Sequence, residues 1–335
     1  MNREASPVGV GSRLRASIGA SGLALLVLAT SAPAAASAAG LAAVVTDGTL
    51  RVTGGSAAEQ ITLRVNALDR SKLLVDVDGS ELSFDLGTFA AIDIDAGSGD
   101  DTVRIDESVA VFTTTKATRI EGGNGDDRLL GGAGAEVLSG GRGDDFIDGN
   151  GGVDTAFLGQ GDDTFVWDPG DASDIVEGQA GFDTMIFNGS IGNEIMAATA
   201  VDGRVLFTRN LGTIVMDLDD VEAIDVRALG GSDSVTVNDV TQSDLQRVDV
   251  DLATALDSSS SDGLADTVTV AGTKGDDAIA ATADGAAVEV SGLAALVRIT
   301  HADADKDTLV IDGGTGDDAV SVDPAVTALI KFAVL

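Results

Sequence analysis

Apolar and polar residues alternate along short stretches of this chain, a period-two pattern that predicts half-buried β-strands. The alternation is clear at Ile92 and Ile94, and again at Val103 and Ile105. After an N-terminal apolar stretch at residues 18–29 there is little sustained helical periodicity. The pattern therefore predicts an all-β protein built from many short strands.

Between residues 122 and 186 the alternation follows a nine-residue repeat. Seven nonapeptides run in phase, interrupted once by Trp167 and Asp168. Glycine recurs at position four, an acid occupies position six and an apolar residue occupies position eight. The position-six acids are Asp127, Glu136, Asp145, Asp154, Asp163, Asp174 and Asp183. The position-eight residues are Leu129, Leu138, Ile147, Ala156, Phe165, Val176 and Met185.

Each nonapeptide combines a tight turn with a very short strand. Glycine permits positive φ in the turn and lets backbones approach closely, and the following three residues point one apolar side chain inward. Successive nonapeptides then run in opposite directions, so one coil takes two repeats. The fold class we predict is all-β, a parallel β-roll or solenoid with flanking strand-rich modules. Its position-six acids stack on two edges, with Asp127, Asp145, Asp163 and Asp183 on one and Glu136, Asp154 and Asp174 on the other.

Stacked carboxylates repel one another at any reasonable effective dielectric constant. A Ca²⁺ ion between adjacent turns removes this repulsion and takes turn carbonyls as further ligands, because it prefers roughly six to eight oxygens. Mg²⁺ fits worse, since it demands a small, rigid octahedron and keeps its waters. We expect up to about five Ca²⁺ ions in this segment, with binding and folding as one process.

The tandem GGxGxD motifs, such as 122–130 GGNGDDRLL and 140–148 GGRGDDFID, resemble the repeats-in-toxin (RTX), or haemolysin-type, calcium-binding repeat. This resemblance implies a parallel β-roll with Ca²⁺ between the turns, and it makes the position-six acids side-chain ligands. It implies carbonyl ligands at Gly123, Gly125, Gly132, Gly134, Gly141, Gly143, Gly152 and Gly161. The chain departs from the family's pattern at Glu136, where Asp is usual. The toxin, protease or lipase domain that often precedes such repeats is missing.

Composition agrees with a calcium-binding interpretation and excludes other classes of function. The formal net charge is −35, and only 10 of the 55 acidic residues are Glu. Such a charge repels phosphate backbones, which excludes a nucleic-acid partner, whereas short Asp side chains favour turns and hard cations. The absence of Cys and the presence of a single His exclude thiolate sites and two-His zinc sites.

The N-terminus is predicted to be a secretory signal peptide. Arg3, Arg13 and Arg15 precede an apolar stretch of about a dozen residues, and the sequence at 36–38, Ala-Ser-Ala, fits a cleavage site. The alternative, a membrane anchor, needs around 18 or more apolar residues. We therefore expect a secreted, extracellular protein with no membrane span after cleavage of the signal.

The flanks carry a longer repeat, because residues 91–106, 223–238 and 308–323 align without gaps and share Asp101, Asp233 and Asp318. We interpret each as a strand-rich module with one isolated calcium-like turn, where the sequence leaves open a bound ion or a plain β-turn. The predicted organisation is a signal peptide (1–38), an N-terminal β module (39–121), a nonapeptide-repeat β-roll (122–187) and C-terminal β modules (188–335).

These observations predict a structural or surface-associated protein that binds calcium and folds with it after secretion, without enzymatic activity. The expected partners are calcium ions and, as a candidate, a cell-surface or matrix polymer. Two alternatives stay open: a surface adhesin or ice-binding-type fibre segment, and a non-catalytic relative of RTX enzymes. A regular exposed threonine array would favour the fibre, but residues 113–115 form only a local cluster.

Overall fold

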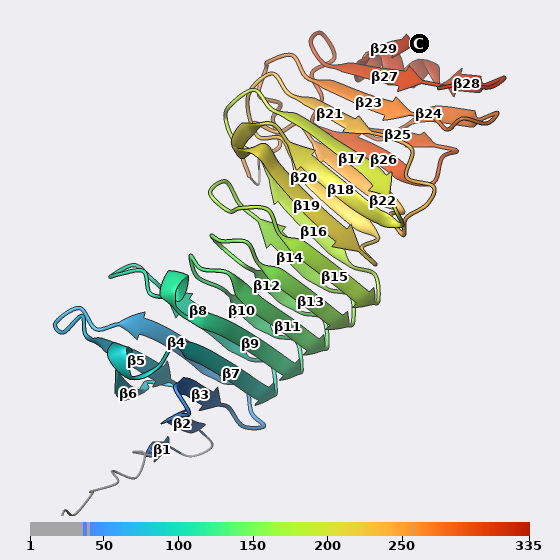
Figure 1. The fold of residues 1–335 in the computed structure, drawn as a ribbon. Helices are drawn as coiled ribbons and strands as arrows, with labels where there is room; N and C mark the ends of the chain where they lie inside the picture. The colour runs from blue at the N-terminus through green and yellow to red at the C-terminus, as the bar shows by residue number, and fades with distance from the viewer. Residues whose placement is uncertain (1–35, 39–40, 257) are drawn as a thin grey trace, which may run out of the picture. The chain divides into compact units, whose positions relative to one another are not determined.

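The computed structural model describes residues 36–38, 41–256 and 258–335, which form two large sheets, sheet A with 15 strands and sheet B with 14 (Figure 1). No α-helix occurs among the described residues, and the four 3-10 helices found there are η1 (Leu86–Thr88), η2 (Thr113–Thr115), η3 (Leu211–Thr213) and η4 (Pro324–Ala328). None of these helices has the length and apolar character that crossing a membrane requires. The predicted all-β solenoid is confirmed. Apart from residues 36–38, the predicted signal peptide lies outside the described residues.

The strands follow one another across each sheet. In sheet A the spatial order is β1 (Ala36–Ala38), β2 (Leu41–Thr46), β3 (Thr49–Thr53), β7 (Ala91–Ser98), β9 (Ala117–Asn124), β11 (Glu136–Arg142), β13 (Thr155–Gln160), β15 (Ile175–Ala180), β19 (Ile214–Asp219), β18 (Arg204–Arg209), β17 (Ile195–Val201), β21 (Ser234–Val237), β23 (Thr267–Ala271), β27 (Thr308–Asp312) and β29 (Lys331–Val334). In sheet B it is β28 (Ala319–Val322), β24 (Ala278–Asp284), β25 (Ala287–Ser291), β26 (Leu296–Thr300), β22 (Arg247–Asp251), β20 (Ala223–Arg227), β16 (Thr184–Asn188), β14 (Thr164–Trp167), β12 (Phe146–Asp148), β10 (Arg128–Leu130), β8 (Thr102–Asp106), β4 (Gln60–Val65), β5 (Lys72–Val77) and β6 (Ser80–Asp85).

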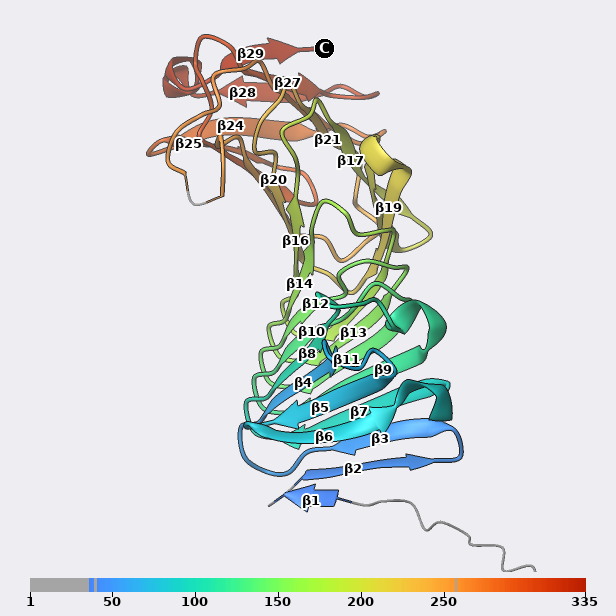
Figure 2. The same cartoon turned by 90° about the vertical axis from the view of Figure 1, so that its left-hand side faces the viewer.

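Within the repeat segment the chain changes sheet at every nonapeptide. Strands β9, β11, β13 and β15 are parallel neighbours in sheet A, and β10, β12, β14 and β16 are parallel neighbours in sheet B. Leu129 lies opposite Ile147, so one coil consists of two repeats. The insertion at residues 167–168 lengthens one coil, which is why Phe165 pairs with Met185. Figure 2 shows the two sheets as separate layers along this segment.

The strands of the flanks join the same two sheets. Three antiparallel groups interrupt the parallel pairing, namely β4–β5–β6, β17–β18–β19 and β24–β25–β26. Parallel pairing continues on both sides of two groups: β17 pairs with β21 and β19 with β15, while β24 pairs with β28 and β26 with β22. The group β4–β5–β6 pairs with β8 through β4 and ends sheet B at β6.

The interior between the two sheets is filled by the position-eight side chains. All seven are fully buried: Leu129, Leu138, Ile147, Ala156, Phe165, Val176 and Met185. Trp167, from the two-residue insertion, is also fully buried. Its ring stacks on Phe187 with a centroid distance of 4.2 Å, and Phe187 in turn contacts Phe207 at 4.7 Å. The insertion therefore places the one tryptophan in the core, where burial of such a large ring contributes strongly to stability.

Glycine at position one of the repeat lies against the next coil. A Cβ atom on Gly140 would lie 2.3 Å from Asp145 Oδ2 and 2.4 Å from the carbonyl oxygen of Leu158. At Gly151, in contrast, the nearest atom to an added Cβ would be the Cα of Ala133, 3.6 Å away. Close approach of the backbone, rather than an unusual φ angle, therefore excludes a side chain at Gly140.

We expect Gly140→Ala to destabilise the protein by about 1–3 kcal/mol, because the added methyl group overpacks a site bounded by backbone. Gly151→Ala is the matched control, with ordinary contacts, and its stability change should be well below this. Urea unfolding followed by circular dichroism measures both. Equal stability of the two variants would contradict the close approach of successive coils at position one.

Candidate metal centre

The position-six acids line up in two rows, one on each edge of the repeat segment. In row one, which precedes the strands of sheet B, the backbone N–H of each acid donates to Oδ1 of the acid one coil further on. The bonds Asp127–Asp145, Asp145–Asp163 and Asp163–Asp183 measure 2.8, 2.7 and 2.9 Å. In row two, which precedes the strands of sheet A, Glu136 donates to Asp154 and Asp154 donates to Asp174 at 2.7 and 2.8 Å. The structure thus brings all seven predicted acids together in rows.

These acids are removed from solvent, with exposed fractions of 2% or less. In six of them the second carboxylate oxygen is buried and has no hydrogen-bond partner; these atoms are Oδ2 of Asp127, Asp145, Asp154, Asp163 and Asp183 and Oε1 of Glu136. A buried, unpartnered carboxylate oxygen is costly unless a charge or a donor satisfies it. Rows one and two therefore need a counterion or protons.

The unpartnered oxygens face backbone carbonyls rather than donors. Both Asp127 Oδ2 and the carbonyl oxygen of Gly140 lie within 3 Å of the point where a Cβ of Gly122 would sit, at 2.4 and 2.8 Å. Asp183 Oδ2 and the carbonyl oxygen of Asp220 converge on Gly178 in the same way, at 2.7 and 1.6 Å. Converging oxygens without a hydrogen between them form the donor set that a hard cation such as Ca²⁺ takes. The residues present therefore fit calcium.

The predicted glycine ligands form the turns, although not all in one conformation. Positive φ angles of 115–138° occur at Gly123, Gly125, Gly141, Gly143, Gly152 and Gly161. Gly132 and Gly134 lack a positive φ, and the N–H of Gly132 instead donates to Glu136 Oε2 at 3.2 Å. The carbonyl oxygens of positions two and four lie against the glycine Cα of the next coil, as Gly123 does against Gly141. The carbonyls that converge with the unpartnered oxygens of Asp127 and Asp145 belong to position one of the next coil, Gly140 and Leu158, a position not predicted as a ligand.

Burial raises the pKa of the position-six acids, because removal from water disfavours the charged form. The pKa rises to about 6 for Asp127 and Asp163, to about 7 for Asp174 and Asp183, to about 8 for Asp145 and to about 9 for Asp154. The pKa of Glu136 is also raised by burial. Neighbouring carboxylates in the same row raise the pKa of Asp145 and Asp154 further. A cation between the coils would reverse these shifts.

Both ends of row one extend beyond the nonapeptides. Asp101 precedes the row, since its N–H donates to Asp127 Oδ1 at 2.8 Å and its own Oδ2 is buried without a partner. Glu222 follows the row and accepts the N–H of Asp183 at 2.7 Å. The turn at 97–101, predicted from the sequence as an isolated one, thus lies next to the repeat segment.

A third row of buried acids occupies the C-terminal part of the chain. Glu194 donates its N–H to Asp233, Asp233 donates to Asp266 and Asp266 donates to Asp307, at 2.8, 2.8 and 2.9 Å. Asp277 and Asp318 form one further bond of the same kind at 2.9 Å. Of these acids, Asp233 and Asp318 lie in the aligned modules of the sequence, and Asp277 lies in a further turn of similar pattern, GTKGDDAIA at 272–280. The others lie in turns without the GGxGxD motif, although Gly189, Gly192 and Glu194 keep the spacing of its positions one, four and six.

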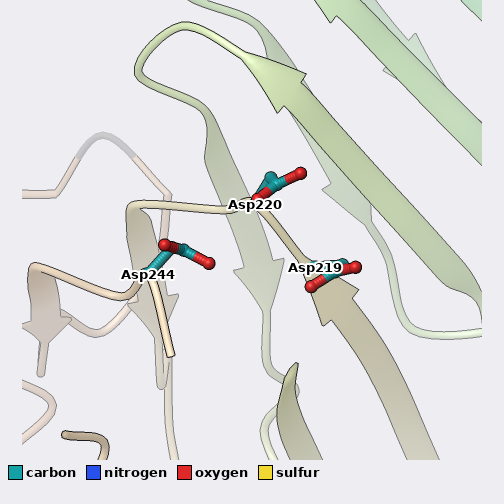
Figure 3. A group of neighbouring side chains, drawn as sticks. All are labelled: Asp219, Asp220 and Asp244. Atoms are coloured by element: carbon teal, nitrogen blue, oxygen red, sulfur yellow. The ribbon is translucent and has the colours of Figure 1, made fainter. Parts of the chain in front are cut away.

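Two acidic groups on the surface were not predicted. Position-five acids form an outer, exposed row, in which Asp100, Asp126 and Asp144 each accept the N–H of the next coil at 2.8–3.1 Å. Asp219, Asp220 and Asp244 have carboxylate oxygens within 4.8 Å of one another, close to the end of row one in sequence (Figure 3). The recurrence of Asp directly before Asp101, Asp127, Asp145 and Asp163 was a visible signal for the outer row. The group around Asp244 had none, because residue 244 is separated from residues 219–220 in the sequence.

Comparison with known proteins agrees with the geometry of rows one and two. Residues 113–145 and 130–165 match the family described as RTX calcium-binding nonapeptide repeat (4 copies). No curated protein matches the chain. The resemblance predicted from the GGxGxD motifs is confirmed, and RTX repeats imply calcium binding and a structural role. The chain therefore contains a segment of RTX-type calcium-binding repeats.

Proposed function

We propose that rows one and two bind Ca²⁺ between successive coils and that this binding drives the folding of the repeat segment. The observation that carries the proposal is the set of buried carboxylate oxygens without partners, which at Asp127, Asp145 and Asp183 converge with a backbone carbonyl of the next coil. Calcium supplies the positive charge that offsets burial of these carboxylates. The protein's own residues hold the ion, and their backbone hydrogen bonds keep successive turns in register.

Three further features support a role outside the cell. RTX repeat proteins are typically secreted, the N-terminal sequence has the pattern of a signal peptide, and extracellular calcium is abundant enough to fill weak sites. On this proposal the chain stays expanded where calcium is scarce and folds after export. Each site then adds stability as the calcium concentration rises above its dissociation constant. A structural or surface-associated role follows, with a cell-surface or matrix polymer as the proposed partner. The absence of enzymatic activity remains a prediction.

The deciding experiment compares the full chain with and without calcium. Hydrogen exchange read by mass spectrometry should show slow exchange for residues 122–186 in millimolar Ca²⁺ and fast exchange after calcium is removed with a chelator. Magnesium at the same concentration should not restore the protection, because it keeps its waters. Unchanged exchange of this segment in the chelator would overturn calcium-coupled folding.

Asp145→Asn should reduce the number of bound calcium ions by one or two, because this carboxylate lies between two neighbours of row one. Asn keeps the oxygen that accepts the N–H of Asp127 but loses the charge. The matched control is Asp144→Asn, since Asp144 is the exposed neighbour in the outer row and accepts a similar backbone bond. Isothermal titration calorimetry measures both, and equal stoichiometries would refute the assignment of row one as ligands.

The stability of the calcium-free protein should fall as pH rises from about 4 to about 9. The buried acids have raised pKa values in the folded state, up to about 8 for Asp145 and about 9 for Asp154. The folded state therefore holds more protons than the unfolded state in this window, and deprotonation disfavours it. Saturating calcium competes with these protons, so it should flatten the dependence. Urea midpoints of calcium-stripped and calcium-loaded protein test this; a calcium-free stability that rises with pH contradicts it.

A further inference from the structure

Glu136 and Glu194 occupy equivalent places in two rows but have different surroundings. Each is at position six of a turn and leads into a strand of sheet A, β11 or β17, and each is at most 1% exposed. In each, the N–H donates to Oδ1 of an Asp in the next coil, at 2.7 Å for Glu136 and 2.8 Å for Glu194. Glu136 Oε1 is buried without a partner, whereas both oxygens of Glu194 are paired.

The turn of Glu194 has the same oxygen geometry as the calcium-type turns. A Cβ on Gly189 would lie 2.6 Å from Glu194 Oε2 and 2.8 Å from the carbonyl oxygens of Arg227 and Ala228. Carboxylate and carbonyl oxygens also converge at Gly122 and Gly178 in row one, where the carboxylate oxygen has no partner. At Gly189 the converging oxygen is Oε2, which accepts a backbone N–H as Glu136 Oε2 does, and Oε1 corresponds to the unpartnered Oε1 of Glu136. Glu194 therefore lies in a turn of the cation-binding type, outside the residues that match the RTX family.

The positive charge at Glu194 is supplied by Arg209. This residue ends β18, whose antiparallel pairing with β17 places Arg209 opposite Met196, two residues after Glu194. Its Nε and Nη2 contact Glu194 Oε1, and its Nη1 donates to the carbonyl of Leu211 at 3.2 Å. The Arg209 side chain is 8% exposed and its guanidinium carbon lies 5.2 Å from the ring centre of Trp167, so the ion pair is buried against the core.

The hydroxyl and N–H of Ser190 complete the shell of Glu194. Ser190 Oγ donates to Oε1 at 3.0 Å and the N–H of Ser190 donates to Oε2 at 2.9 Å. Among the described residues, no acid after Asp183 has a buried oxygen without a partner. Asp307 Oδ2 accepts the N–H of Asp303 at 2.6 Å, and Asp277 Oδ2 accepts the N–H of Thr273 at 2.7 Å.

We propose that Arg209 is a built-in cation that takes the place of a metal ion at the Glu194 turn, so that residues 189–335 fold without calcium. The guanidinium is always charged, and its planar donors match a carboxylate. Unlike a bound ion, it is not lost by dissociation when calcium is scarce. The protein then consists of a repeat segment that depends on calcium and a C-terminal segment that does not. This inference rests on the proposed function only in taking calcium as the cation of rows one and two.

The test uses the full chain and its Arg209→Met variant, followed by hydrogen exchange of β17, β18 and β21 at several calcium concentrations. In the wild type these strands should stay protected from exchange at a chelator concentration at which residues 122–186 exchange fast. In Arg209→Met, Glu194 is left as a buried, unpaired charge, and protection in the chelator should fall by more than about a hundredfold. Millimolar calcium should restore it, with one additional ion bound per chain.

Two variants serve as controls. Arg204→Met removes another arginine of β18, one that pairs with the half-buried Glu177 and Asp217 instead, and it should leave calcium dependence as in the wild type. Glu194→Gln/Arg209→Met removes both charges and should fold in the chelator. If Arg209→Met does not fold at any calcium concentration, folding of the double variant still supports the proposal, and its failure to fold overturns it.

The remaining outcomes separate this proposal from the proposed function. Loss of protection in β17, β18 and β21 of the wild type at the same calcium concentration as in residues 122–186 overturns the role of Arg209 alone. A folded Arg209→Met variant with no more calcium dependence than Arg204→Met does the same. Wild-type exchange that is independent of calcium in every segment overturns the proposed function and leaves no metal for Arg209 to replace.

Discussion

Each turn of the repeat segment buries a carboxylate between two coils, where one oxygen accepts a backbone N–H and, at Asp127, Asp145 and Asp183, the other converges with a carbonyl. The first contact sets the register of successive coils, and the second demands positive charge. Neither sheet alone supplies that charge, because the interior is apolar and the net charge of the chain is −35. On the proposed function, a counterion at these turns is therefore the condition on which coil stacking depends.

The position-one glycines and the apolar position-eight side chains contribute to the same stacking of the coils. Position-one glycines lie so close to the next coil that a methyl group has no space, and this closeness is what lets the carboxylate and carbonyl oxygens converge. Position-eight side chains then bury fully between the sheets and favour collapse of the coils by the hydrophobic effect. Burial of the apolar residues and burial of the acids are thus coupled, since neither happens without the other.

The negative charge of the buried acids can be balanced in two ways along this chain. Rows one and two leave oxygens free for an external ion, whereas at Glu194 an arginine from the neighbouring hairpin strand fills that place. The β17–β18–β19 group explains the difference, because its antiparallel pairing places the end of β18, with Arg209, beside the Glu194 turn. An uninterrupted coil offers no such side chain.

The local sequence was sufficient to determine the period, the two edges of acids and the apolar layer, because each is set by residues nine or eighteen apart. The same reasoning could not identify Glu222 and Glu194, two acids beyond this array, and it could not identify Arg209. Glu222 lies 39 residues after Asp183, and Glu194 lies 39 before Asp233, because hairpins of variable length intervene. Tertiary structure decided these pairings: hydrogen bonding within each sheet restores in space the register that the insertions remove from the sequence.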